Sequence, residues 1–423
     1  MRMQLRRLTL GFFLLFSMRN VTIAQTGSGN RKYDIGDVEV DFISSYYQQD
    51  GDHGAVLGGI GSQALHDQVF AVELKIPVDS QYIYNAKLSF DSYTSASSAA
   101  IDPGIPVPYA LRGDPYPLTG ASYKDQRKYG NFGFTNMFKD NQSYNVGLGF
   151  SSEFDVTSFS ANGGYSIESA DKNTSLQFNL VGMRDNWKLI YPVELRYLQG
   201  RPDTLLQTHI RNTFSGSVVL SRVLTPRFQA ALIYEYTYQK GILSTPFHRV
   251  VFNDGRSVGD FFKTVSIEKL PDFRNKHAFG LRTSAYPFNS LIIRNFFRYY
   301  FDSFGIESYT AEIELPVKFT RFFSVYPFYR YYRQTASTYF KPFNEHVPGE
   351  KFYTSDYDLS GFTSQKIGAG MRLSPPFGIS RSNSTNFLNH HTAFKSINFR
   401  GGIYQRSDGL HSFFGSIDLT FTL

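Results

Sequence analysis

Hydrophobic and polar residues alternate with a period of two along much of the chain, most clearly at its C-terminal end. One face of the final stretch carries Phe413, Ile417, Leu419, Phe421 and Leu423. The other face carries Ser412, Ser416, Asp418, Thr420 and Thr422. Such alternation places one face of an extended strand in an apolar medium and the other in a polar one. A chain that ends this way, with aromatic residues on the apolar face, is typical of a barrel that closes in a membrane on its last strand.

Similar alternating segments recur along the chain and predict sixteen strands. They cover residues 35–47, 67–78, 83–95, 127–138, 143–154, 157–169, 175–186, 209–224, 228–243, 276–288, 291–306, 308–320, 321–337, 360–374, 394–406 and 409–423. Bacterial single-chain barrels have an even number of strands, so both ends lie on the periplasmic side. The prediction is therefore an all-β fold, a transmembrane antiparallel up-and-down β-barrel of about 16 strands. Barrels of 14 or 18 strands remain alternatives, because one hairpin is easily miscounted.

The lengths of the predicted links give an independent test of the barrel. Short, turn-like links fall at residues 79–80, 139–141, 170–173, 225–227 and 289–290, and long ones at 48–66, 96–126, 187–208, 244–275 and 338–359. Short turns on one side and long loops on the other are the outer-membrane pattern, with the short side periplasmic. Residues 375–393 are an exception, because they form a long link on the short side. They are either a missed hairpin or a plug-like periplasmic segment.

The first 24 residues have the layout of a secretory signal peptide. A basic head precedes an apolar run over residues 8–18, and Ala24 ends a small-residue cleavage site. We expect residues 25–34 to form a short periplasmic segment and residues 35–423 to form an outer-membrane barrel with long extracellular loops. Because the signal holds four arginines and no acidic residue, its removal lowers the formal charge from +7 to +3. The basic balance therefore indicates no nucleic-acid partner.

The composition excludes several other classes of protein. The chain has no cysteine, which excludes a disulfide scaffold, a thiol nucleophile and a cysteine-ligated metal. No apolar run of about 18 residues follows the signal, so the chain is not a helical membrane protein. Aromatic residues make up 17% of the chain although its mean hydropathy is −0.29, as expected of strands with one lipid face and one wet face. No nucleotide-binding or HExxH motif is present, and no cofactor is predicted.

If the apolar faces point outward, the polar faces line the lumen and carry many charges. The lumen-lining candidates are Arg282, Arg294, Arg298, Arg330, Lys366, Arg372, Arg400, Glu235, Glu312 and Glu314. Two interpretations remain open. These charges set the ion preference of a pore, because a low-dielectric wall focuses their field, or they pair across the lumen and fill a closed barrel.

A glycine-rich loop after the first strand offers a possible cation site. Asp50, Asp52 and His53 lie within four residues of one another there, and oxygen and imidazole ligands suit divalent cations. The spacing matches no complete calcium or zinc motif. An ordinary polar turn, in which aspartates bond to nearby backbone, explains the same residues.

Three catalytic arrangements can be drawn from the sequence. The same loop offers an Asp–His pair at the rim, Glu312 and Glu314 share a face as paired carboxylates, and histidines such as His66 and His277 offer a lipid-face Ser–His pair. None has an identifiable third group to orient it. We therefore predict that the protein is not an enzyme.

Two segments carry a resemblance to a known family. They are VDFISSYYQQDGDHGAVLGGIGSQAL (residues 40–65) and FDSYTSASSAAID (residues 90–102). The chain resembles an uncharacterised family of Bacteroidota-type outer-membrane proteins, often encoded beside a periplasmic flavin transferase and thioredoxin-like proteins. The resemblance implies a role in an envelope redox or flavin-linked system, in transport or anchoring. It supplies no catalytic residues.

The sequence as a whole predicts a pore, a transporter or a component of an envelope complex. The alternatives are a non-conducting structural or docking barrel for periplasmic partners, and a rim-located enzyme. The expected partners are outer-membrane lipid, the barrel-assembly machinery and periplasmic redox or flavin proteins. We expect Phe421 and Leu423, on the apolar face of the last strand, to form part of the assembly signal.

Overall fold

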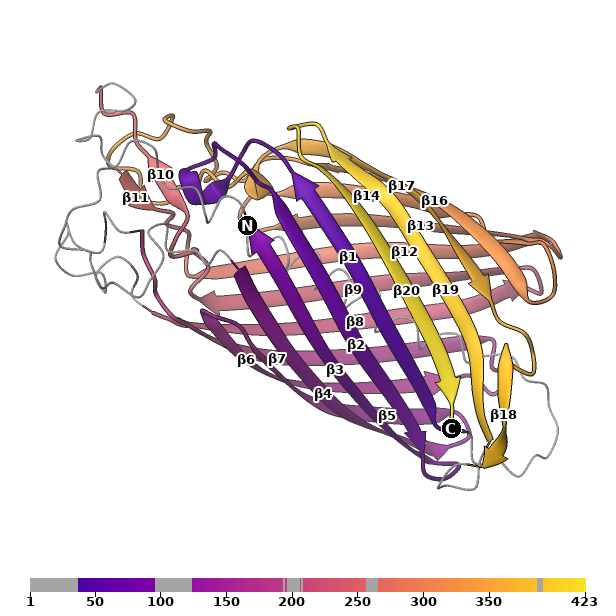
Figure 1. Ribbon diagram of the computed structural model, residues 1–423. Helices are drawn as coiled ribbons and strands as arrows, with labels where there is room; N and C mark the ends of the chain where they lie inside the picture. The colour runs from indigo at the N-terminus through magenta and orange to yellow at the C-terminus, as the bar shows by residue number, and fades with distance from the viewer. Residues whose placement is uncertain are drawn as a thin grey trace.

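In the computed structural model the chain forms a closed antiparallel β-barrel of sixteen strands (Figure 1). The structure describes residues 37–95, 124–192, 208–255, 265–385 and 391–423, together with residues 195 and 206. The predicted signal peptide and the segment 25–34 lie outside the described residues.

The wall strands follow one another around the barrel in chain order. The first half consists of β1 (Glu39–Asp50), β2 (Leu65–Pro77), β3 (Tyr82–Ser95), β4 (Lys124–Lys139), β5 (Gln142–Ser152), β6 (Val156–Glu168), β7 (Thr174–Trp187) and β8 (Ile210–Thr225). The second half consists of β9 (Phe228–Gly241), β12 (Phe273–Phe288), β13 (Leu291–Asp302), β14 (Glu307–Glu314) continued by β15 (Val317–Lys318), β16 (Phe323–Gln334), β17 (Phe362–Leu373), β19 (His391–Arg406) and β20 (His411–Thr422). Because β14 and β15 both pair between β13 and β16, they form one wall strand, so the predicted count is confirmed.

The barrel closes between its first and last strands. β1 pairs with β2 on one side and with β20 on the other, from Glu39 opposite Thr422 to Asp50 opposite His411. Closure leaves no free edge in the lipid, where unpaired backbone groups would find no water. The predicted role of the C-terminal strand in closing the barrel is confirmed.

Links at the two ends of the barrel differ in length, as predicted (Figure 1). The long link between β17 and β19 contains β18 (Ser380–Thr385), which pairs antiparallel with the start of β19, with Ser380 opposite Phe394. β17 pairs with β19 only as far as Ile397, so β18 takes over its place along the same edge. Residues 380–385 are therefore part of a hairpin that extends the wall, and the plug interpretation is wrong for them. Residues 386–390 lie outside the described part.

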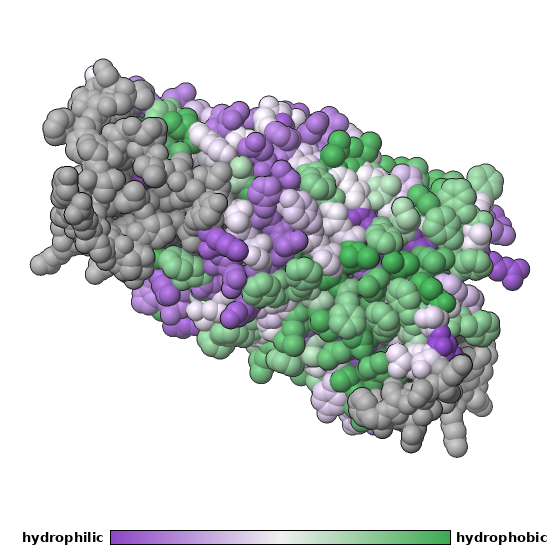
Figure 2. All heavy atoms as spheres, in the orientation of Figure 1, coloured by the Kyte–Doolittle hydropathy of each residue, from purple (hydrophilic) through white to green (hydrophobic). Residues whose placement is uncertain are grey.

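The outward face of the wall is apolar. Phe42 is 46% exposed, and its ring meets that of Phe421 edge-on at 5.7 Å, so the apolar face of the last strand points outward as predicted. Figure 2 shows hydrophobic residues gathered over the half of the barrel nearer the short turns, and hydrophilic residues toward the long loops. No helix among the described residues is long and apolar enough to cross a bilayer.

Candidate functional site: the lumen and its cap

An ion pair across two intervening strands identifies the interior face. Arg400 on β19 lies 3.5 Å from Glu314 on β14, although β16 and β17 stand between them in the wall. Three strand spacings of about 4.8 Å cover roughly 14 Å along the wall. Only side chains on the concave face of a curved sheet approach each other over such a span, so Arg400 and Glu314 point into the lumen.

Strand register places all ten lumen-lining candidates on this interior face. Glu312, Arg330 and Lys366 are successive cross-strand partners, and the alternation along each strand places the other seven candidates on the same side. Arg294 pairs with Glu314 at 2.8 Å, and Arg298 pairs with Glu235 at 2.9 Å across β12. Glu314 thus has two arginine partners and Glu235 has one, in line with the pairing interpretation for part of the set.

Aromatic residues that the sequence did not single out also face the lumen beside these charges. The rings of Phe328 on β16 and Phe414 on β20 lie 6.3 Å apart, although two strands separate them. Each lies against a glycine on the neighbouring strand, because a Cβ at Gly368 would come within 2.5 Å of the Phe328 ring and one at Gly402 within 3.0 Å of the Phe414 ring. The available sequence signal was a phenylalanine at position 414 on the polar face of the last strand.

The opposite wall of the lumen is small and neutral. Asn145, Gly164, Asn179 and Ser217 are successive cross-strand neighbours on β5 to β8, and the same row continues to Glu235. These strands face β16 to β20 across the ring of strands. The lumen therefore has one wall rich in cations and rings, and one wall of amides, hydroxyls and glycines.

Exposure of the interior face changes along the barrel axis. Nearer the short turns, Val181 is 41% exposed and the side chain of Arg294 is 48% exposed, so solvent reaches the interior there. Toward the long loops, Asp185 on the same strand as Val181 is 0% exposed and Asp302 on the same strand as Arg294 is 9% exposed. The lumen is therefore accessible on the short-turn side and covered on the other.

Three of the long links form this cover, here called the cap: residues 51–64, 242–255 with 265–272, and 335–361. Within the second loop, β10 (Arg249–Val251) pairs with β11 (Val265–Ile267). Leu243 and Leu270 of the second loop pack with Leu359 of the third loop in one buried cluster. The backbone of Lys269 exchanges two hydrogen bonds with that of Tyr353, at 2.9 and 2.7 Å. The cap is thus a packed unit built from segments far apart in sequence.

Contacts between loops from opposite walls show that the cap crosses the mouth. The loop 51–64 joins β1 to β2, whereas the loop 242–272 joins β9 to β12 on the far side of the ring of strands. Arg249 Nη1 nevertheless donates a 2.9 Å hydrogen bond to the carbonyl of Val56. His53 also stacks on Tyr357 of the third loop, with ring centroids 3.8 Å apart and planes 7° from parallel.

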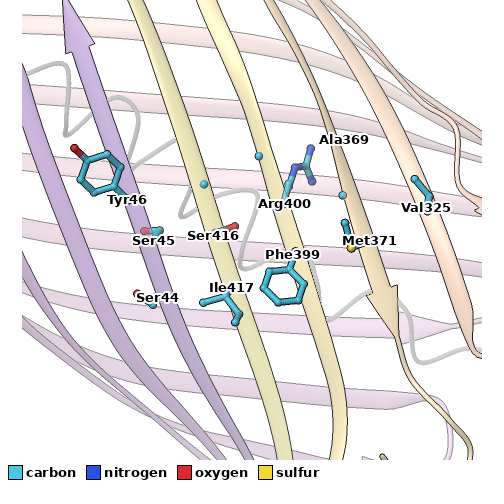
Figure 3. A pocket seen from close by; sticks show the side chains of 13 residues that line it. Ser44, Ser45, Tyr46, Val325, Ala369, Met371, Phe399, Arg400, Ser416 and Ile417 are labelled. Carbon is cyan, nitrogen blue, oxygen red and sulfur yellow. The ribbon is translucent and has the colours of Figure 1, made fainter.

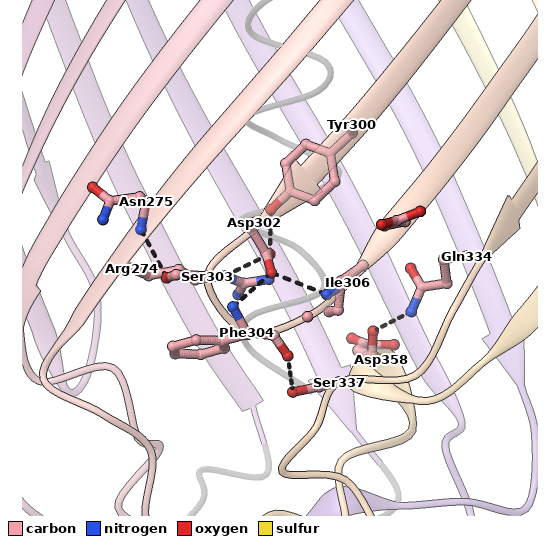
Figure 4. A network of polar contacts seen from close by, with 12 residues as sticks. Arg274, Asn275, Tyr300, Asp302, Ser303, Phe304, Ile306, Gln334, Ser337 and Asp358 are labelled. Atoms are coloured by element: carbon pink, nitrogen blue, oxygen red, sulfur yellow. Dashed lines mark hydrogen bonds and ion pairs between the residues drawn. The ribbon is translucent and has the colours of Figure 1, made fainter.

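Polar groups at the upper rim of the barrel anchor the cap (Figure 4). Asp302 accepts hydrogen bonds from Arg274 Nε at 2.8 Å and from the backbone N–H of Phe304 at 2.9 Å. Gln334 donates to the carbonyl of Asp358 at 3.0 Å. Figure 4 shows these groups converging where the strands meet the loops.

A second anchor lies on β19. Arg406 pairs with Asp358 at 2.7 Å and donates to the carbonyl of Tyr357, also at 2.7 Å. The side chains of Arg406 and Asp358 are 3% and 8% exposed, and Arg406 also pairs with Asp408, so one buried cation serves two carboxylates at the rim. The third loop of the cap is therefore fixed to the inner rim of the barrel.

The family of the chain follows from a family model described as "Protein of unknown function (DUF3570)", which matches residues 13–387. The chain belongs to the DUF3570 family. No curated protein matches it.

Solved structures similar to this DUF3570 barrel are outer-membrane proteins. A bacterial polysaccharide outer membrane secretin has a TM-score of 0.47 and 10% identity over 92% of this chain and 99% of that chain. A BenF-like porin from Pseudomonas fluorescens Pf-5 has a TM-score of 0.42 and 7% identity over 92% and 98%. OccK9 (OpdG) from Pseudomonas aeruginosa has a TM-score of 0.40 and 7% identity over 91% and 98%. These values transfer no functional property.

The candidate cation loop of this DUF3570 protein is part of the cap. Asp50 accepts a 2.8 Å bond from the N–H of Gly51, and His53 Nδ1 lies 3.1 Å from the carbonyl of Gly59. Within the described ranges, the carboxylates and histidines that come together with metal-like spacing are Asp125, Glu153 and Asp155, and the predicted trio Asp50, Asp52 and His53 is not such a group. The contacts of His53 are those of a structural residue.

The histidines and carboxylates considered for catalysis have structural partners. His66 and His277 lie 3.0 and 3.1 Å from the hydroxyls of Tyr46 and Tyr234, as expected of polar aromatic pairs near a membrane interface. Glu314 is engaged by two arginines. Each of these two histidines thus faces a tyrosine hydroxyl, and not the serine that a Ser–His pair requires.

A hollow of about 500 Å³ lies on the outward face of the DUF3570 barrel, at the seam between its first and last strands (Figure 3). Its floor is a row of cross-strand neighbours that includes Gly415, Gly401 and Ala369. Because the side chains of this row are small, the hollow remains between the row and larger side chains around it, such as Phe399 and Met371.

Proposed function

We propose that the protein is an outer-membrane channel for small water-soluble solutes, closed on the extracellular side by the cap and opened when the cap loops separate. The observation that carries this proposal is the change in exposure along the interior face, from Val181 at 41% to Asp185 at 0% on one strand. A barrel filled with packed side chains would bury its interior along the whole length. This lumen is accessible up to the cap.

The cap suits a gate because single hydrogen bonds and small apolar contacts, such as that of Val56 with Phe247, hold its parts together across the mouth. Arg249 bonds to Val56 O, and Lys269 bonds to Tyr353 through backbone alone. A hydrogen bond that water can replace contributes only about 0.5–1.5 kcal/mol net. Separation of the loops therefore costs far less than separation of two wall strands.

A reversible crosslink tests whether the cap controls passage. Lys269 and Tyr353 form a hydrogen-bonded antiparallel pair, in which Cα atoms are about 5.5 Å apart, within the range that a disulfide requires. The chain has no cysteine of its own. In planar bilayers, the Lys269→Cys/Tyr353→Cys protein is expected to conduct less when oxidised and to recover when a reductant is added.

A release variant tests the same gate in the opposite direction. Arg249→Met removes the hydrogen bond across the mouth, and channel openings are expected to become several-fold more frequent. Lys351→Met, which removes a cation from the cap without touching that contact, serves as the matched control. The channel proposal fails if wild type, the reduced double-cysteine protein and Arg249→Met all lack conductance.

Export and assembly form part of the proposal. Residues 1–24 would be removed as a signal peptide, and the barrel-assembly machinery would insert the barrel into the outer membrane. Mass spectrometry of protein purified from outer membranes should then find an N-terminus at Gln25. An intact N-terminal Met1 would contradict cleavage.

A docking barrel for periplasmic redox or flavin proteins is the second candidate. It is supported by the sequence resemblance to a family encoded beside a flavin transferase and thioredoxin-like proteins. Co-purification of such a protein with a barrel that conducts in neither cap state would favour it. Conduction that depends on the cap would favour the channel.

A further inference from the structure

Three cations lie together on the interior face of β16, β17 and β19. Arg330 and Lys366 are direct cross-strand partners, and Lys366 and Arg400 lie over two rings, Phe414 and Phe328, whose centroids are 6.3 Å apart. Like charges opposite each other on neighbouring strands are destabilising. Their presence on one patch therefore needs an explanation other than barrel stability.

Acidic neighbours offset this patch only in part. Glu314 lies 3.5 Å from Arg400, but it also pairs with Arg294 at 2.8 Å. Glu312 is the cross-strand partner of Arg330, but in the part of the chain that the structure describes neither Arg330 nor Lys366 has a carboxylate at ion-pairing distance. The carboxylates beside the patch, Glu312 and Glu314, are fewer than the arginines and the lysine around them. The patch is thus a region of positive potential in a low-dielectric wall.

Aromatic rings form the base of the patch. Lys366 Nζ lies 3.9 Å from the centroid of the Phe414 ring, and the guanidinium carbon of Arg400 lies 4.2 Å from that of Phe328. These cation–π contacts hold the charged groups in place without neutralising them. Gly368 and Gly402 have no side chain, so the rings of Phe328 and Phe414 lie against the wall. They present an apolar surface to the lumen next to the cations.

We propose that Arg330, Lys366, Arg400, Phe328 and Phe414 form a binding site for small organic anions, with the cations holding a carboxylate and the rings holding an apolar body. Guanidinium and ammonium groups bind carboxylates through charge-assisted hydrogen bonds. The site lies on the inner wall between the cap and the periplasmic opening. It rests on the proposed function only for its role in transport, because binding itself does not require conduction.

Equilibrium binding to the full chain in detergent tests the site. Sodium benzoate is the probe, since it carries one carboxylate and one ring, and benzyl alcohol is the neutral analogue of similar shape. In isothermal titration calorimetry, benzoate is expected to bind at least about ten-fold more tightly than benzyl alcohol. Inorganic phosphate, which has charge but no apolar body, should bind more weakly than benzoate.

Two single variants and a matched control locate the site. Lys366→Met and Arg330→Met are each expected to weaken benzoate binding by roughly ten-fold or more. Lys318→Met removes an exposed cation of β15 at the short-turn end of the wall, outside the site, and should leave the affinity within about two-fold. Unchanged heat-modifiable migration on gels would show that each variant forms the barrel.

The outcomes separate this site from the channel proposal. Benzoate binding by a barrel that does not conduct would retain the site and reject the channel, whereas a conducting barrel that prefers cations would reject the site. Equal affinity for benzoate and benzyl alcohol, or equal loss in Lys366→Met and Lys318→Met, would also overturn it. Phosphate binding as tight as that of benzoate would overturn the assigned role of the rings.

Discussion

Arg249 donates a 2.9 Å hydrogen bond to the carbonyl of Val56, although the two residues are 193 positions apart and their loops leave opposite walls of the barrel. The side chain and its acceptor are both buried, so loss of the bond leaves a buried acceptor unsatisfied, at a cost of about 1–3 kcal/mol. This contact makes the cap a bridge over the mouth rather than a set of separate loops.

Arg249→Met should therefore loosen the cap while the wall strands stay intact. Limited proteolysis is expected to cleave the variant within residues 242–255 several-fold faster than wild type. Lys351→Met should be cleaved at the wild-type rate. Unaltered cleavage of Arg249→Met would show that the bond across the mouth does not hold the cap.

The role of His53 can be tested by substitutions that keep or remove its ring. His53 stacks on Tyr357 at 3.8 Å, so His53→Phe should preserve the cap and its conductance behaviour, whereas His53→Ala should raise the frequency of openings. A metal ligand or catalytic base would be lost equally in both variants. Equal effects in bilayer recordings would therefore contradict the structural role.

Assembly should depend on the outward face of the last strand. The Phe421 ring packs on Phe42 at 5.7 Å and on Phe394 at 4.9 Å, and the N–H of Leu423 bonds to the carbonyl of Val38 at 2.9 Å. We expect Phe421→Asp, or deletion of the last few residues, to abolish insertion, and Phe421→Leu to insert normally. Fractionation of outer membranes checks this, and normal insertion of Phe421→Asp would refute the signal.

The interior glycines should control the width of the lumen. A Cβ at Gly368 would come within 2.2 Å of the carbonyl oxygen of Gly401 and within 2.5 Å of the Phe328 ring, so Gly368→Val should displace both the neighbouring strand and the ring, alter conductance and cost more than about 1–3 kcal/mol of stability. Gly415 has no atom near its Cβ position and faces the outer hollow, so Gly415→Val is the control. Similar conductance changes in both variants would contradict the role of the ring.

Acid should weaken one corner of the cap. Burial raises the pKa of Glu350, but hydrogen bonds from Lys341 and His346 outweigh it and hold the pKa at about 2, below its ordinary value of 4.5. Because its pKa is lower in the folded state, the ionised Glu350 carboxylate stabilises the fold above pH 4.5. This contribution disappears as the pH falls toward 2. Hydrogen exchange over residues 341–354, corrected for intrinsic rates, should rise over that range.

Glu350→Gln provides the control for this pH effect. The variant should exchange faster than wild type at pH 6 and show a smaller further rise on acidification. A wild-type profile that does not change between pH 5 and pH 2 would show that the carboxylate contributes nothing to the cap.

The alternation along the chain was enough to predict which strands form the wall of the barrel and which residues face outward. Side chains alternate between the faces of a strand, and lipid and water demand opposite chemistry, so the pattern around Phe421 and its neighbours reports which residues point outward. The same alternation placed Arg330, Lys366 and Arg400 on one face before any contact was known. Loop lengths predicted the orientation, and they left a missed hairpin and a plug as the two interpretations of residues 375–393, where the short pairing of β18 with β19 favours the hairpin.

What fills and covers the lumen depends on contacts between segments far apart in the chain, which are known only from the tertiary structure. Arg400 meets Glu314 because the curvature of the wall brings distant strands together, and Arg249 meets Val56 because two loops cross the mouth. Phe414 faces inward over Gly402, where the alternation suggested a polar residue. These contacts depend on barrel closure and on packing between segments far apart in the chain, which a local period of two cannot encode.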